Sequence, residues 1–156
     1  MKYEDVAWHS GSDDYPKDLP AQAAATHTGM FIAWALTSGL GSTLLAADAG
    51  ELRARKVTPG AFFYSQCDGK FTDEDLNDEG NAFAKLYFDP EVAMYLGDYD
   101  AVLCSGLKSA YHVPDTWSTA GSPNGGAASS ESGRGGSSGA DDVTRGRTER
   151  RRRPPI

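Results

Sequence analysis

Hydrophobic residues recur at helical spacing in several segments of this chain, and alternation of the strand type is scarce. In the segment 21–37, His27, Phe31 and Trp34 stand at positions i, i+4 and i+7, which places them on one face of a helix. Gly29 lies inside this predicted helix, where glycine costs about 1 kcal/mol relative to alanine. We therefore expect another backbone to approach the helix closely at Gly29.

Start signals and the same spacing predict further helices. One helix is predicted over 42–55. We expect Leu44, Leu45 and Leu52 of this helix to face the core. Thr58 as N-cap and Pro59 as the first helical residue begin another. Two more are expected over 77–88 and 90–103. Their apolar side chains at helical spacing are Phe83, Leu86, Tyr87, Val92, Tyr95, Leu96, Tyr99, Val102 and Leu103.

The two ends of the periodic region have no clear spacing. Residues 1–20 contain turn formers and two prolines, so we expect them to be irregular. Tyr111, Val113 and Trp117 are expected to dock on the helices as a short extended segment. The predicted fold class is mainly α: a small single-domain helical bundle with an irregular N-terminal segment, followed by a disordered tail.

Composition divides the chain near residue 118. Residues 1–118 hold all three tryptophans and form the predicted helical domain, whereas 119–156 are rich in Gly, Ser and Arg and form the predicted disordered tail. The domain has a formal charge of 8 − 18 = −10, and the tail has 7 − 4 = +3. Phosphate contacts need positive charge, so the folded body is a poor match for nucleic acid and suits a basic protein partner.

The sequence carries no mark of export or of a membrane span. The opening "MKYEDVAWHSGSDDYP" lacks the apolar core of a signal peptide, and no apolar run approaches the roughly 18 residues of a spanning helix. Cys67 and Cys104 stand far apart with no CxxC, which is typical of free thiols in a reducing compartment. We expect a cytoplasmic protein with no membrane contact.

Candidate catalytic and metal-binding residues are few. His9, His27 and His112 are scattered, with no HxxxH spacing, so no metal and no cofactor are expected. The run "TDEDLNDEGN" does not complete a calcium-binding EF-hand loop in either register. The chain has no GxSxG elbow and no phosphate-binding loop. Asp68 directly follows Cys67, and a neighbouring carboxylate raises a thiol pKa and weakens the nucleophile.

His27 has two interpretations. In the structural one, its imidazole is buried, hydrogen-bonded to a backbone carbonyl or a carboxylate, and stacked near Trp34. In the functional one, it lines a pocket with Trp8, His9 and Asp14 nearby. A lone histidine on an apolar helix face favours the structural interpretation.

Four stretches together resemble a known family: "YEDVAWH", "LPAQAAATHTGMFIAW", "CDGK" and "YHVPDTW". Over about residues 3–117 the chain is similar to an uncharacterised bacterial domain-of-unknown-function family (DUF7832-like). The resemblance implies a small protein that binds a partner, as immunity or accessory proteins do, and it carries over no catalytic residue. The matching positions taken as candidate binding residues are Trp8, His9, His27, Trp34, Asp68, Lys70, His112, Asp115 and Trp117. Beyond Trp117 the chain departs from the family, and either a natural flexible tail or a shifted reading frame explains the change.

Two functions of different classes follow. The favoured one is an acidic protein-binding module that masks a basic partner such as a toxin. The acids expected to speed this association are Asp73, Glu74, Asp75, Asp78 and Glu79. The alternative is a small hydrolase-like enzyme that uses a His/Asp pocket drawn from His9, His27, Asp68 or His112. A structural or regulatory protein fits equally well, and the missing catalytic motif and the acidic charge favour binding over catalysis.

Overall fold

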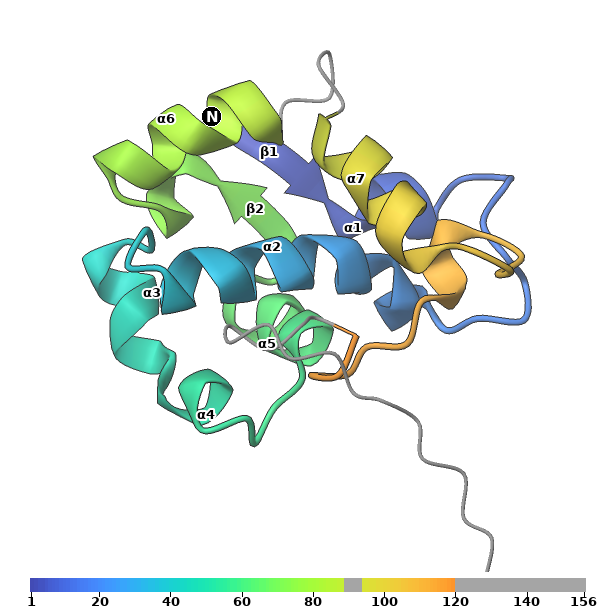
Figure 1. Ribbon diagram of the computed structural model, residues 1–156, viewed down its shortest axis with the longest axis horizontal. Helices are drawn as coiled ribbons and strands as arrows, with labels where there is room; N and C mark the ends of the chain where they lie inside the picture. Colours follow the sequence, from blue (N-terminus) through green and yellow to red (C-terminus); the bar gives the residue numbers. More distant parts are fainter. Residues whose placement is uncertain (89–93, 120–156) are drawn as a thin grey trace, which may run out of the picture. The chain divides into compact units, whose positions relative to one another are not determined.

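The computed structural model describes residues 1–88 and 94–119. In chain order its elements are β1 (Lys2–Asp5), α1 (Val6–Ser10), η1 (Ala21–Ala25), α2 (Thr26–Thr37), α3 (Thr43–Asp48), α4 (Gly50–Arg53), α5 (Pro59–Gln66), β2 (Lys70–Thr72), η2 (Asp73–Asp75), α6 (Asp78–Tyr87), α7 (Met94–Leu103) and η3 (Ala110–His112). The described part therefore has seven α-helices, three short 3₁₀ helices and one two-stranded sheet (Figure 1). The mainly α fold class is confirmed.

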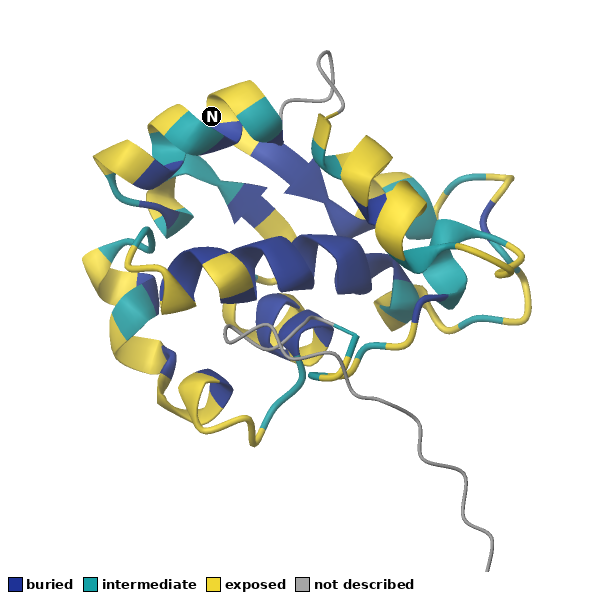
Figure 2. Cartoon of the chain, viewed as in Figure 1, coloured by how far each residue is buried: buried dark blue, intermediate teal, exposed yellow. Residues whose placement is uncertain are grey.

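Helix α2 is the central element of the fold. Figure 1 shows it running between α5 and the β1–β2 sheet. The ring of Phe31, in α2, lies 5.6 Å from the ring of Phe71 in β2. Figure 2 shows that nearly the whole helix is buried, and the exposed positions on it are Trp34 and the last residue, Thr37. Because α2 is covered on most sides, its apolar residues do not form a single stripe.

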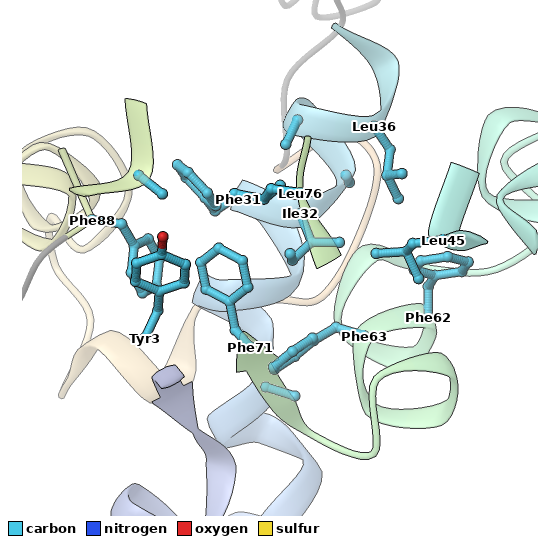
Figure 3. Close-up of a cluster of buried hydrophobic side chains, with 14 of the residues drawn as sticks. Tyr3, Phe31, Ile32, Leu36, Leu45, Phe62, Phe63, Phe71, Leu76 and Phe88 are labelled. Atoms are coloured by element: carbon cyan, nitrogen blue, oxygen red, sulfur yellow. The ribbon is translucent and has the colours of Figure 1, made fainter. Parts of the chain in front are cut away.

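The core gathers large side chains from several elements around α2 (Figure 3). Ile32, Phe63 and Phe71 are fully buried. Phe31 also packs on Phe88 at a ring distance of 4.8 Å. Each such side chain contributes about 1.5–3 kcal/mol by leaving water, so this cluster accounts for much of the stability of the domain.

Gly29 sits where α2 crosses α5. A Cβ atom at Gly29 would lie 2.5 Å from the Cα of Gly60 and 2.5 Å from the carbonyl oxygen of Pro59. Real Cβ atoms do not approach other atoms this closely, so only glycine fits here. The expectation of a close backbone approach at Gly29 is confirmed.

The prediction of an irregular N-terminal segment is wrong for residues 2–10, which form β1 and α1. Strand β1 pairs antiparallel with β2, with Glu4 opposite Phe71 and an irregularity in register between Lys2 and Glu4. Tyr3 and Glu4 are both buried, so the alternation expected of a half-buried strand is absent. The strand also depends on a partner more than 60 residues away, which no local pattern records.

Several leucine and valine positions predicted to face inward are exposed. Leu45 and Leu52 are buried as expected, but Leu44 is 82% exposed. The predicted single helix over 42–55 is in fact two short ones, α3 and α4, which break near Ala49 and do not share one face. Further exposed positions are Leu86, Leu96 and Val102, and Val92 lies outside the described residues.

The segment after α7 docks on the core as predicted, with a different local conformation. Val113 is buried, and Tyr111 and Trp117 are half-buried. Tyr111 lies in the 3₁₀ turn η3 instead of an extended segment. By contacts the chain separates into Met1–Gly126 and Ala127–Ile156. The predicted tail, apart from Thr119, lies outside the described residues.

None of the helices in the described ranges has the length and the apolar composition needed to cross a bilayer.

Candidate functional site

Glu4, His9 and His27 form a carboxylate–histidine cluster at the junction of β1, α1 and α2. Strand β1 passes directly into α1, because the Asp5 carboxylate caps the helix by accepting a hydrogen bond from the Ala7 amide at 3.0 Å. The Val6 amide donates to the carbonyl of Gly69 at 2.9 Å and ties this junction to the sheet. The abrupt change from strand to helix places Glu4 and His9 beside each other.

The three side chains converge through their polar ends. Glu4 Oε1 is 3.0 Å from His9 Nε2, and Glu4 Oε2 is 3.7 Å from His27 Nε2. The two imidazole rings meet edge to face at a centroid distance of 5.0 Å. The side chains of Glu4 and His27 are 10% and 7% exposed, and that of His9 is 24% exposed. The cluster is therefore buried, with a solvent-facing side at His9.

The Glu4 carboxylate is ionised in this setting. Burial by itself raises the pKa of Glu4, but the neighbouring His27 and His9 side chains and the Asp5 amide lower it to about 2. The Asp5 amide donates to Glu4 Oε1 at 2.8 Å. A buried carboxylate thus faces two imidazoles, which is an arrangement suited to holding a proton or a cation.

Tyrosines surround the two histidines. The Tyr111 hydroxyl lies 2.9 Å from His9 Nδ1, and the Tyr95 hydroxyl donates to the backbone carbonyl of His27 at 2.6 Å. The ring of Tyr99 lies 6.1 Å from the ring of His27. The Nε2 atoms of His9 and His27 and the Tyr99 hydroxyl are buried and have no hydrogen-bond partner among the described residues. Among these groups His27 Nε2 has its nearest carboxylate oxygen 3.7 Å away, whereas His9 Nε2 faces Glu4 Oε1 at 3.0 Å without suitable hydrogen-bond geometry.

His27 combines parts of both interpretations. It is buried beside a carboxylate, as the structural interpretation requires, but at 3.7 Å the contact is too long for a hydrogen bond. The predicted stacking of His27 near Trp34 is wrong, since the aromatic rings beside Trp34 are those of Phe31 and Phe83. His9 is adjacent, as the functional interpretation expects.

An aromatic groove of about 490 Å³ opens between α2, α6 and α7. Its lining residues include Trp34, Phe83, Tyr87, Tyr95, Asp98 and Val102. Tyr87 donates to Asp98 Oδ2 at 2.5 Å. This hydrogen bond, followed by burial, raises the pKa of Tyr87 to about 12. The groove is apolar over most of its lining and carries a carboxylate at one point.

The remaining candidate binding residues are distributed over other places. Trp8 is 55% exposed, and the Lys2 ammonium lies 5.0 Å from the centre of its ring. Lys70 pairs with Asp68 at 2.5 Å in an exposed turn. His112 lies 3.4 Å from the Asp18 carboxylate. The candidate residues that the structure brings into the cluster are His9 and His27.

Asp115 and Trp117 meet at the start of α5, where their contacts are structural. Asp115 Oδ1 accepts from the Gly60 amide at 2.8 Å, and Oδ2 accepts from the Ala61 amide at 3.1 Å. Trp117 Nε1 donates to the carbonyl of Val57 at 2.9 Å. Both residues anchor the C-terminal segment of the domain on α5.

Sequence reasoning missed Glu4, which completes the cluster. The available signal was its position in "KYEDV", where an acidic residue stands between the apolar Tyr3 and Val6. It also missed the groove, because Val102 was expected to be covered.

A family model described as Domain of unknown function (DUF7832) matches residues 2–113. Neither the curated proteins nor the solved structures gave a match.

Proposed function

This chain belongs to the DUF7832 family, a domain family of unknown function, and we propose that it is an acidic protein-binding module of the immunity or accessory type. Its aromatic groove receives the apolar face of a basic amphipathic segment of a partner protein, such as a toxin. The observation that carries this proposal is the groove itself, which leaves aromatic and aliphatic side chains in contact with water.

The groove has the composition of a binding surface. Trp34 is 44% exposed and Val102 is 75% exposed, although both are large and apolar. Aromatic side chains that are partly buried in a pocket contribute most to binding free energy in protein interfaces. Exposed apolar side chains that gather at a hollow typically mark an interaction site.

The charge of the helices beside the groove supports a basic occupant. Helix α7 carries Asp98 and Asp100 and no basic side chain, and both acids are exposed. Helix α6 adds two acids against the single Lys85. A segment with lysine or arginine beside its apolar face would pair with Asp98 in the groove, and the other carboxylates of the two helices would attract it.

The acids predicted to speed association divide into two groups. The Asp73 carboxylate pairs with the N-terminal amine, and Asp75 accepts from the Thr72 amide at 2.7 Å. These two acids are engaged within the protein. The exposed acids that remain available to attract a basic partner are Glu74, Asp78 and Glu79.

The test uses two labelled model helices of the same length, one built from leucine and lysine and one from leucine and glutamate. We expect the lysine helix to bind the full-length chain, with an affinity that falls as salt is added, and the glutamate helix not to bind. Fluorescence anisotropy measures both.

Matched variants locate the binding. Val102→Gln removes an exposed apolar side chain inside the groove, and Leu44→Gln removes one outside it. We expect Val102→Gln to weaken binding about tenfold, which corresponds to the 1–2 kcal/mol of an interface anchor, and Leu44→Gln to leave it unchanged. Equal affinity of the two variants, or no binding of the lysine helix, would refute the proposal.

The enzyme alternative has less support from the geometry. His9 and His27 face Glu4, not an aspartate. His112 and Asp68 lie elsewhere, in contact with Asp18 and Lys70.

We place the protein in the bacterial cytoplasm as part of the same proposal. Cys67 and Cys104 are both free thiols, as is usual in a reducing compartment.

A further inference from the structure

We propose that Glu4, His9 and His27 bind a divalent transition-metal ion, with zinc as the best fit. The site lies apart from the aromatic groove, and the proposal does not depend on the proposed partner binding. Two imidazoles and one carboxylate are a zinc ligand set that leaves a fourth position for water.

The distances within the cluster are close to those that zinc requires. Zinc bonds of about 2.0–2.2 Å in a tetrahedron place neighbouring ligand atoms about 3.3 Å apart. The two Glu4–histidine distances, 3.0 and 3.7 Å, lie on either side of this value. One ligand atom from each residue can be chosen so that all three lie within 4.8 Å of one another. Small rotations of these side chains would bring ligand atoms that now lie within 4.8 Å of one another to the spacing of a zinc site.

The second observation is the pair of buried imidazole nitrogens without a hydrogen bond. His27 is 94% buried, with a relative exposure of 6%, and its Nε2 has no partner among the described residues. His9 Nε2 is also buried without a hydrogen bond of suitable geometry, although Glu4 Oε1 lies 3.0 Å from it. A buried polar atom left unpaired is destabilising, and coordination of an ion by both nitrogens would remove that cost.

Tyr111 has the position of an outer partner of the site. Its hydroxyl is 2.9 Å from His9 Nδ1. When the hydroxyl oxygen accepts the proton of Nδ1, Nε2 carries the lone pair that a metal needs. Histidine ligands in metal sites regularly have such a partner on the second nitrogen. His9, with 24% of its side chain exposed, also gives an ion a route from solvent.

Calorimetry of the untagged full-length chain, after treatment with a chelator, tests the proposal with zinc ions alone. We expect one zinc ion per chain and a rise in melting temperature on zinc addition. Glu4→Gln and His9→Ala should lose both effects. His112→Ala removes a histidine outside the cluster and should retain both, so it is the matched control.

Tyr111→Phe keeps all three ligands and removes the outer hydroxyl, so it should still bind zinc, with affinity reduced about 10- to 100-fold. This variant tests the site even if a cluster variant fails to fold, which circular dichroism would reveal. Absence of zinc binding by the wild type, or equal binding by wild type and folded His9→Ala, would overturn the proposal. So would loss of binding in His112→Ala alone.

Discussion

Gly29 shows how one residue sets the distance between two helices. Replacement by alanine would force its Cβ to within 2.5 Å of the α5 backbone. We predict that Gly29→Ala lowers the free energy of unfolding by about 1–3 kcal/mol or more, because the helices must move apart. Urea denaturation measures the change.

Gly97 in α7 is the matched control, since a Cβ there would meet nothing within 4 Å. Gly97→Ala should raise the free energy of unfolding by up to about 1 kcal/mol through helix propensity alone. Similar effects of the two substitutions would mean that the contact between α2 and α5 is not as close as described.

Cys67 is predicted to be an unreactive thiol. Burial, and then the nearby Asp75 carboxylate, raise the pKa of Cys67 to about 12. The thiolate fraction therefore increases about tenfold per pH unit up to that value, and at pH 8 it is on the order of a thousand times smaller than for an ordinary cysteine. Alkylation of Cys104→Ser, in which Cys67 is the remaining cysteine, should be slow at pH 8 and fast in urea. Rapid alkylation of the folded variant at pH 8 would contradict this.

Among single residues, sequence reasoning succeeded where the cause was local or steric. The close backbone approach at Gly29 was predicted because glycine destabilises the interior of a helix, so its presence there indicates that a larger side chain has no space. The low reactivity of Cys67 was also expected, but for another reason. The sequence pointed to Asp68 as its cause, whereas burial and the Asp75 carboxylate raise the pKa of the thiol. Asp75 is eight positions away, so only the fold brings it to the thiol.

At the scale of elements, the start of α5 depends on a distant cap. Thr58 was predicted as the N-cap, and it occupies that position without capping the helix by its own side chain. Its hydroxyl instead donates to Asp115 at 2.5 Å, and Asp115 accepts from the first amides of the helix. The local sequence could place the helix start but not the residue that satisfies it.

We predict that Asp115→Ala lowers the free energy of unfolding by about 1–2 kcal/mol, the usual effect of removing a helix cap. The exposed Asp13 gives a control of equal charge change, and Asp13→Ala should have an effect within about 0.5 kcal/mol of zero. Thermal or chemical denaturation compares the two. If both variants are equally stable, Asp115 does not cap α5.

The helices and the sheet also differ in how far the sequence predicts them. Helix α2 and the start of α5 follow from spacing and capping signals within a few residues. Strand β1 was missed because three of its four residues are buried in succession, without alternation, and because it pairs with β2 far along the chain. Glu4 was missed for the same reason, since its approach to the histidines requires this strand and the turn into α1.

At the scale of the whole molecule, α2 contributes to both candidate sites. His27 at its first turn belongs to the cluster, and Trp34 at its last turns lines the groove. Tyr95 and Tyr99 of α7 line the groove and contact His27. The spacing of α2 predicted its apolar face, but only the arrangement of α6 and α7 decides which part of that face stays open.

The aromatic groove as a site for a basic partner is the central claim, and an NMR titration of the full-length chain with the leucine–lysine helix tests it most directly. The account predicts that amide signals of α6, α7 and the Trp34 end of α2 shift together as the peptide is added, with little change in α3 and α4. Shifts centred on α3 and α4, or the same shifts with the leucine–glutamate helix, would contradict it.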